Sequence, residues 1–149
     1  MNLLSRRSLL AIAAVTDIAL HGRTSPVSAK ALAARHGLPP RHMEPLLQAL
    51  VRQGILKGLR GPRGGYELAR ERRRITAGDI VRVVMASADD EGAAPLPRSR
   101  LVDQVVEPAI RKGSQAFLQE LDAVTVDDLC VEAGVAGAVQ TRPVSDFTI

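Results

Sequence analysis

Cysteine is nearly absent from this chain of 149 residues, and its single cysteine is Cys130. One thiol excludes an intramolecular disulfide and any metal site built from several cysteines of one chain. Chains without disulfides are typical of a reducing compartment, so we expect a cytoplasmic protein. Cys130 itself is interpreted as a small buried hydrophobic residue, with a redox-sensitive thiol as the alternative.

Aromatic residues and long apolar runs are scarce too. Tryptophan is absent, and the only aromatic residues are Tyr66, Phe117 and Phe147. Since 46% of the residues are hydrophobic, alanine, leucine and valine must build the core, which favours closely packed helices. No apolar run approaches the ~18 residues that a membrane-spanning helix needs, so we expect no membrane partner.

The motifs of common catalytic sites are also missing. The sequence has no glycine-rich phosphate loop ending in Lys-Ser or Lys-Thr and no histidine pair at metal-ligand spacing. No serine or cysteine has a plausible neighbouring base. We therefore predict that the protein is not an enzyme.

Charge is plentiful but unevenly distributed. Residues 1–82 hold 15 lysines and arginines against 5 acidic residues, whereas residues 83–149 hold 5 against 11. The chain is thus a basic half of net charge +10 joined to an acidic half of net charge −6. A basic half of this size indicates a polyanion, such as double-stranded DNA, as the partner.

The pair Arg6-Arg7 precedes an apolar run and allows two interpretations. It resembles a twin-arginine export signal, but it also begins a stretch, 5–20, whose apolar residues recur at spacings of three and four. Asp17 interrupts the uncharged segment that an export signal requires. We therefore interpret 5–20 as an amphipathic helix that ends at His21-Gly22.

Two short helices are predicted next. Ser28 is a good N-cap for a helix over 29–36, and Gly37 follows it as a stop. Pro40 can occupy the first turn of a third helix that continues to residue 53. Two short helices joined by a tight turn form a helix-turn-helix, whose second helix presents its first turn to the major groove of DNA.

The stretch 55–68 is predicted to form a β-hairpin with a basic tip. Two β-prone runs flank a turn rich in glycine and proline, and Arg60 and Arg63 place two positive charges in that turn. A hairpin directly after a helix-turn-helix makes a winged helix. Tyr66 is interpreted either as a half-buried residue that packs the root of the wing or as a DNA contact.

The segment that follows the wing is basic and then helical. The cluster at residues 70 and 72–74 either is solvated or contacts the flanks of DNA. Thr76 and Asp79 have the spacing of a capping box, which predicts a helix with an apolar face that continues past Val84.

The acidic half begins with a polar segment and ends with helices. A long helix is predicted over 101–124, and Pro108 either kinks it or marks the start of its regular part. Thr125 caps a short helix over 126–133, which Gly134 would end. Because the apolar stripe of the long helix exceeds what one small domain can cover, we interpret it as a dimer interface, with core packing as the alternative.

The predicted fold class is therefore mainly helical with a small β-hairpin: a winged helix-turn-helix followed by a long dimerisation helix. The domain boundaries follow from the elements. We expect a DNA-binding domain over 1–86, an exposed loop over 87–100, dimerisation helices over 101–134 and a disordered tail over 135–149.

Four stretches, 10–19, 38–47, 60–68 and 75–80, occur in an order that resembles the Rrf2 family of bacterial winged-helix transcription regulators. The third contains Arg-Gly-Pro-Arg-Gly-Gly-Tyr and is the most specific, because it lies between a recognition helix and the segment Ile-Thr-Ala-Gly-Asp-Ile. Members of the family include an iron–sulfur cluster regulator, a nitric-oxide-sensitive repressor and a cysteine-metabolism repressor.

This resemblance implies DNA contacts at eight positions. The family's base-reading positions fall on Arg41 and Glu44, and the wing arginine that enters the minor groove falls on Arg60. Since a carboxylate only accepts hydrogen bonds, Glu44 would select a cytosine amino group. His42 stands where the family commonly has tyrosine. The positions that would contact phosphates are Ser28, Arg63, Gly64 and Gly65.

The resemblance also leads to predictions about the cofactor and the function. Sensing members of the family hold an iron–sulfur cluster with three cysteines in the region that matches 87–100, where this chain has none. We predict no cluster and no other cofactor, which leaves the effector open. The predicted function is a repressor that binds a palindromic operator as a homodimer. The alternative is a winged-helix module that binds protein through the apolar long helix.

Overall fold

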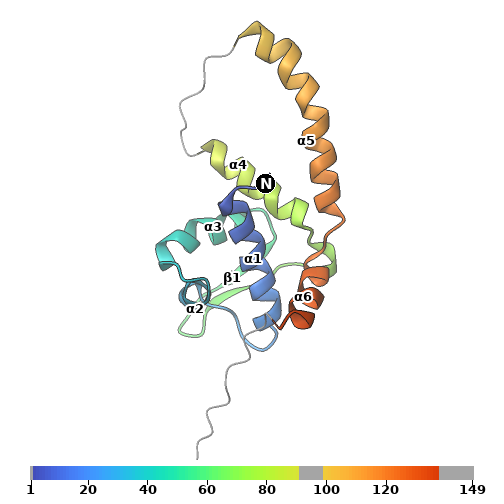
Figure 1. The fold of residues 1–149 in the computed structure, drawn as a ribbon. Coiled ribbons are helices and arrows are strands. Elements are labelled where there is room, and N and C mark those ends of the chain that lie inside the picture. The colour runs from blue at the N-terminus through green and yellow to red at the C-terminus, as the bar shows by residue number, and fades with distance from the viewer. Residues whose placement is uncertain (1, 91–98, 138–149) are drawn as a thin grey trace, which may run out of the picture.

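The computed structural model describes residues 2–90 and 99–137 and shows a mainly helical protein with one β-hairpin (Figure 1). Its elements, in chain order, are helices α1 (Arg6–His21), α2 (Ala29–Arg35) and α3 (Pro40–Arg52), strands β1 (Leu56–Leu59) and β2 (Gly65–Leu68), the 3-10 helix η1 (Arg72–Arg74), helix α4 (Ala77–Asp90), the π-helix η2 (Val102–Val106), and helices α5 (Glu107–Asp122) and α6 (Val126–Val135). This order confirms the predicted winged helix-turn-helix followed by a long helix.

Helix α1 lies at the centre of the DNA-binding half and contacts α2, α4, α6 and β2. The Ser5 hydroxyl accepts a hydrogen bond from the Ser8 amide at 3.1 Å and so caps the helix, which ends at Gly22. One face is made of small and branched residues that are fully or almost fully buried, namely Ala11, Ala14, Val15 and Ile18. The amphipathic interpretation of 5–20 is therefore confirmed.

Helices α2 and α3 form the predicted helix-turn-helix. The Ser28 hydroxyl accepts a hydrogen bond from the Ala31 amide at 3.1 Å and caps α2. Gly37 and Gly54 follow α2 and α3 with positive φ angles of 65° and 73°, a conformation that favours glycine. The buried face of α3 includes Met43 and Leu47, which fixes its exposed face toward solvent.

The wing is a two-stranded antiparallel hairpin. Strand β1 pairs with β2 in the register Leu56 to Leu68 and Leu59 to Gly65. An isolated bridge adds Val27 beside β2, with hydrogen bonds of 3.0 and 2.8 Å to the backbone of Tyr66. The loop before α2 therefore supports the root of the wing.

Helix α4 begins with the predicted capping box and extends further than expected. The Asp79 carboxylate accepts a hydrogen bond from the Thr76 amide at 3.1 Å, and the Thr76 hydroxyl accepts one from the Asp79 amide at 3.0 Å. The helix continues to Asp90, so the prediction of a loop from residue 87 is wrong at its start. Ser87 lies inside this helix, and its hydroxyl donates to the Val84 carbonyl at 2.9 Å; residues 91–98 lie outside the described part.

Pro108 is accommodated by a change of helix type. The amide of Glu107 donates to the carbonyl of Val102, five residues back, which is the hydrogen-bond pattern of a π-helix. Regular α-helix then begins at Glu107 with Pro108 in its first turn, as one of the two sequence interpretations proposed. Across 2–90 and 99–137, no helix combines the length and the hydropathy that a membrane span requires.

Helix α6 also differs from its predicted end. The Thr125 hydroxyl and the Asp128 carboxylate form the N-terminal capping box, but the helix passes through Gly134 to Val135. A Cβ at Gly134 would meet nothing within 4 Å, whereas Gly137 has a positive φ of 65° and follows the true end. The predicted stop at Gly134 is therefore wrong. The expected disordered tail falls mostly on 138–149, outside the described residues.

The C-terminal helices are joined to the winged helix at the start of α4. Backbone hydrogen bonds of 2.8 Å connect the segments 75–77 and 124–126 in both directions. Beside them, Arg82 donates to both carboxylate oxygens of Asp122 at 2.6 and 2.8 Å. The hydrogen bonds from Arg82, with a weaker contribution from Thr76, hold the pKa of Asp122 below its usual value.

A buried carboxylate joins α1 to α2. Asp17 is only 8% exposed, and Arg35 donates to both of its carboxylate oxygens, through Nε at 3.1 and 3.0 Å and through Nη2 to Oδ1 at 2.5 Å. His21 and His36 approach the same carboxylate at 3.1 and 3.2 Å. The residue that interrupts the apolar pattern of 5–20 is thus the anchor of the helix-turn-helix.

We predict that Asp17→Asn lowers the free energy of unfolding by about 1.5–3 kcal/mol, because the Arg35 guanidinium then loses its charged acceptor in a half-buried site. Urea denaturation followed by far-ultraviolet circular dichroism measures the change.

Glu120→Gln is the matched control. Glu120 is exposed, and the described residues offer it no ion-pair partner, so the substitution should change stability by less than about 0.5 kcal/mol. Equal losses in the two variants would show that Asp17 contributes nothing beyond its net charge.

Candidate nucleic-acid interface

The first turns of α3 present polar side chains to solvent. Arg41, His42 and Glu44 are exposed, while Met43 between them is fully buried. The Arg41 Nε lies 3.4 Å from the His42 Nε2. Three of the predicted DNA-binding residues therefore share one exposed patch at the head of the second helix of the helix-turn-helix.

The Arg6-Arg7 pair lies beside this patch. A hollow of about 400 Å³ between α1 and α3 is lined by both arginines and by Arg41 and His42. Sequence reasoning did not assign the pair to the interface. The signal was present in its charge, but the sequence does not show that the start of α1 lies beside the start of α3, as the lining of this hollow does.

The tip of the wing carries the next two predicted residues. Arg60 and Arg63 are both exposed, and Gly61 between them has a φ of 109°. The Gly64 amide donates to the Gly61 carbonyl at 2.9 Å. This amide closes the turn, so it is not a free N–H donor that a phosphate could accept.

Gly65 has a structural reason to be glycine. A Cβ at this position would lie 2.6 Å from the Val27 carbonyl oxygen, because the loop before α2 crosses the wing there. Gly64 is constrained in the same way by the Leu59 carbonyl. The two glycines that the sequence places at phosphates are therefore required by the packing of the wing itself.

Tyr66 connects the wing to α3. Its ring is half-buried against the core, and its hydroxyl accepts a hydrogen bond from Gln48 Nε2 at 3.1 Å. This confirms the packing role among its two predicted roles. Gln48 was not predicted, although it lies four residues after Glu44 and thus on the same helical face. The bond fixes the wing relative to the exposed patch.

Ser28 and the basic cluster after the wing are engaged within the protein. The Ser28 hydroxyl caps α2, as its sequence position predicts. Arg72 and Arg73 of the basic cluster pair with Asp127 of α6 at 2.6 and 3.6 Å. Neither predicted role of the cluster, solvation or DNA contact, anticipated this link to the C-terminal helix.

Cys130 lies in the hydrophobic core and is 6% exposed. Burial raises the pKa of its thiol, and the nearby Arg72 only partly opposes this effect. A protonated, buried thiol is a poor nucleophile and metal ligand. Its surroundings therefore match the interpretation as a small hydrophobic residue.

A family model described as "Rrf2: Iron-dependent Transcriptional regulator" matches residues 4–132. A protein of Synechocystis sp. that bears the name of an HTH-type transcriptional regulator is 34% identical over 135 residues, which are 87% of this chain and 88% of that protein. The regulator IscR of Vibrio atlanticus is 34% identical over 86 residues, 58% of this chain and 50% of IscR.

The iron in the family description raises the question of which residues here would bind it. The described residues contain no group of three histidine, cysteine or acidic side chains placed to hold a metal ion. The whole sequence supplies one thiol, and that thiol is buried in the core. These residues do not fit a thiolate-bound iron–sulfur cluster, which needs several cysteines.

Two solved structures share the fold over most of the chain. The structure of T. potens IscR matches with a TM-score of 0.70 at 33% identity and covers 94% of each chain. CymR, the global cysteine regulator of B. subtilis, matches with a TM-score of 0.65 at 27% identity and covers 89% of this chain and 98% of its own. With the winged helix-turn-helix and the family match over 4–132, these likenesses show that the chain belongs to the Rrf2 family of HTH-type transcriptional regulators.

Proposed function

We propose that the protein is a cytoplasmic repressor that binds a palindromic DNA operator as a homodimer and carries no iron–sulfur cluster. The observation that carries this proposal is the exposed patch of Arg41, His42 and Glu44, held beside a wing whose tip presents Arg60 and Arg63. The patch has the shape and the donors to read base edges, and the wing has the charge to hold the backbone.

The residues divide into readers of sequence and holders of phosphate. Arg41 would donate both terminal nitrogens to a guanine, and Glu44 would accept from a cytosine amino group. Arg60 would enter the adjacent minor groove, where its fixed charge is attracted by the negative potential. The predicted contacts to phosphates are Ser28, Arg63, Gly64 and Gly65, with the two glycines allowing a close approach of the backbone. His42, at the position where the family commonly has tyrosine, completes the exposed patch.

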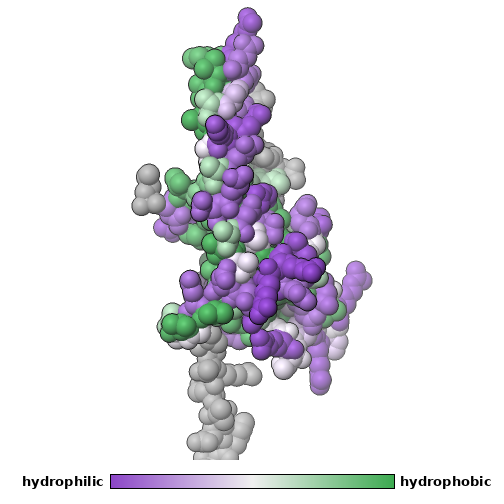
Figure 2. All heavy atoms as spheres, turned by 90° about the vertical axis from the view of Figure 1, so that its right-hand side faces the viewer, coloured by the Kyte–Doolittle hydropathy of each residue, from purple (hydrophilic) through white to green (hydrophobic). Residues whose placement is uncertain are grey.

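The homodimer is supported by an exposed apolar edge on η2 and α5. Val102, Val105, Val106 and Ile110, which we call the apolar edge, are 41–63% exposed. Figure 2 shows hydrophobic residues gathered along one side of the arm that projects from the molecule. Core packing, the alternative, applies only to the second half of α5, where Phe117 and Leu118 are half-buried. A second copy crossing the first at the edge would remove it from water.

The proposed repressor role and the proposed lack of a cluster rest on two features of the chain, its exposed surfaces and its single cysteine. A dimer seated on an operator would block polymerase by occupying the site, and the exposed patch, the wing and the apolar edge are the features that support this role. The single buried thiol supplies none of the ligand sets that an iron–sulfur cluster requires. The purified protein should therefore show no visible absorption from such a cluster.

Selection of bound sequences from random DNA tests the proposal. The protein should enrich one palindromic motif, and its affinity for that motif should fall linearly with salt on a double-logarithmic plot. A module that only binds protein through the apolar edge would bind DNA weakly and without sequence preference, which would refute the proposal.

The two wing arginines should respond differently to alanine. Arg60→Ala is expected to cost about 1–3 kcal/mol of binding free energy and to relax the preference at the outer positions of the site. Arg63→Ala should weaken specific and random DNA alike and reduce the salt slope by about one. Fluorescence anisotropy on both kinds of duplex measures this, and matching losses for both variants on both duplexes would contradict the assignment.

Charge in the apolar edge should dissociate the dimer. We predict that Ile110→Glu raises the dimer dissociation constant by about thirtyfold or more, because a carboxylate would be buried among apolar side chains. Sedimentation equilibrium measures this constant. Lys112→Glu, at an exposed position two residues away and therefore on another face of α5, is the control and should leave the dimer intact.

A further inference from the structure

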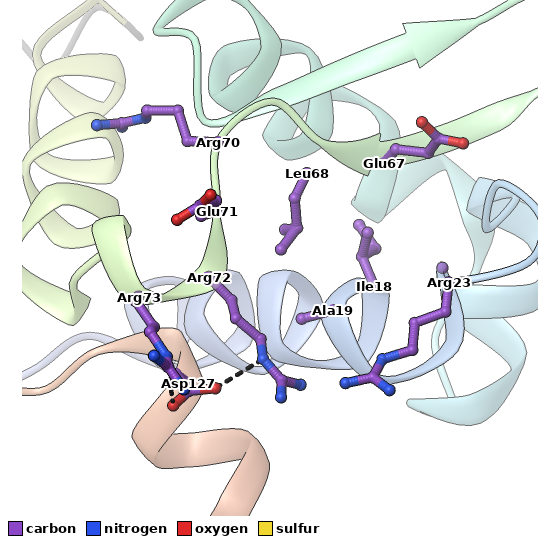
Figure 3. Close-up of a pocket in the computed structure, with 11 residues that line it drawn as sticks. Ile18, Ala19, Arg23, Glu67, Leu68, Arg70, Glu71, Arg72, Arg73 and Asp127 are labelled. Atoms are coloured by element: carbon purple, nitrogen blue, oxygen red, sulfur yellow. Dashed lines mark ion pairs between the residues drawn. The ribbon is translucent and has the colours of Figure 1, made fainter.

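A second hollow lies away from the tip of the wing, between α1, the end of β2, η1 and α6. Its volume is about 550 Å³. Four arginines and three acidic residues line it over an apolar floor; the charged residues are Arg23, Arg70, Arg72, Arg73, Glu67, Glu71 and Asp127. We call it the arginine hollow, and Figure 3 shows its side chains.

Most of its acidic groups already have partners. Glu67 pairs with Lys57 at 3.3 Å, and Asp127 pairs with Arg72 and Arg73. Arg23, by contrast, has no ion pair with any residue of the described ranges. Glu71 and Asp127 line the same hollow, but within the described ranges neither forms an ion pair with Arg23.

Two guanidinium groups meet in the arginine hollow. In Figure 3 the terminal nitrogens of Arg23 and Arg72 point toward one another, and Asp127 approaches Arg72 on its Nε side at 2.6 Å. The side chain of Arg70 points away from this pair. Both Arg23 and Arg72 also act to lower the pKa of the nearby Cys130 thiol, against the larger effect of burial and the opposing charge of Asp127.

Like charges that face each other repel, and an anion placed between them offsets this repulsion. Guanidinium groups are suited to such an anion because their paired N–H donors match the oxygens of a carboxylate or a phosphate. The floor below them is apolar and consists of Ile18, Ala19 and Leu68. The geometry therefore combines two anion donors with a surface that would cover a small hydrophobic body.

We propose that the arginine hollow is an effector site that binds a small organic anion, a carboxylate or a phosphate monoester with a compact apolar body. The oxygens of the anion bridge Arg23 and Arg72, and its apolar body lies on Ile18, Ala19 and Leu68. The regulatory part of this inference rests on the proposed function, since an effector requires a DNA-binding activity to control.

The walls of the arginine hollow explain how a ligand bound there would affect DNA binding. Leu68 belongs to β2 at the root of the wing, Arg23 lies in the loop that leads to α2, and Asp127 belongs to α6. A ligand that draws Arg23 and Arg72 together competes with Asp127 for Arg72. Binding therefore biases the contact of η1 with α6 and the position of the wing together.

Isothermal titration of the full-length protein with phenyl phosphate, benzoate and inorganic phosphate tests the site at constant ionic strength. Phenyl phosphate or benzoate should bind saturably at about one per chain, and at least fivefold more tightly than inorganic phosphate because only they cover the apolar floor. Arg23→Gln should weaken that binding at least tenfold; this exposed residue makes no described ion pair, so the variant should fold.

Arg74→Gln is the control for net charge. Arg74 is exposed on η1, the 3-10 helix that also carries Arg72, but it does not line the arginine hollow. It should bind the probes like the wild type. No saturable binding by any probe, or equal binding by the wild type and Arg23→Gln, would overturn the site.

Operator affinity with and without saturating phenyl phosphate then tests the effector role. The wild type should change its affinity at least threefold, and Arg23→Gln should not. The same change in both proteins would identify a general salt effect and overturn the effector role. Probe binding without any sequence-specific DNA binding would instead refute the proposed function and leave the anion site standing.

Discussion

The fold depends on the close packing of neighbours around α1. Its buried face carries alanine at two fully buried positions, Ala11 and Ala14, where small side chains leave room for the neighbouring elements. In a chain with three aromatic residues, packing of this kind must supply most of the hydrophobic stabilisation. The Asp17–Arg35 pair connects α1 to α2, and it constrains how the two helices pack because a buried charge must keep its hydrogen-bonded partner.

Local signals predicted most of the fold. Capping residues such as Ser5, Ser28 and Thr125 each mark a helix start, and the glycines at 37 and 54 each follow a helix end. Such signals act over three or four residues, which is why they can be read from sequence. The signals that misled were also local. Gly134 costs the helix about 0.5–1 kcal/mol relative to alanine, which does not end α6, and α4 passes through Ser87 without a break.

Less of the candidate site than of the fold could be predicted from the sequence. The exposed positions of α3 could be predicted, because burial of Met43 and Leu47 sets which side chains face outward. The Gln48–Tyr66 bond, the Arg6-Arg7 pair beside Arg41, and the partners of Asp17 could not, because each joins residues that are far apart in the chain. The two wing glycines show the same limit. The glycine pattern that indicates a phosphate site has a second explanation, because a side chain at Gly65 would collide with the Val27 carbonyl. The sequence alone does not reveal this contact.

The π-helical turn before Pro108 gives the projecting arm an unusual tolerance in length. A π-turn holds one residue more than an α-turn, so deletion of one residue within 102–106 could convert it to α-helix and leave the arm continuous. Because the five residues of the π-turn cover about the same rotation as four residues of α-helix, the side chains before the deletion would keep nearly the same direction relative to Ile110. The apolar edge would then remain one face, shorter by one residue. In this arm, the π-turn therefore absorbs an extra residue while keeping the apolar edge on a single side.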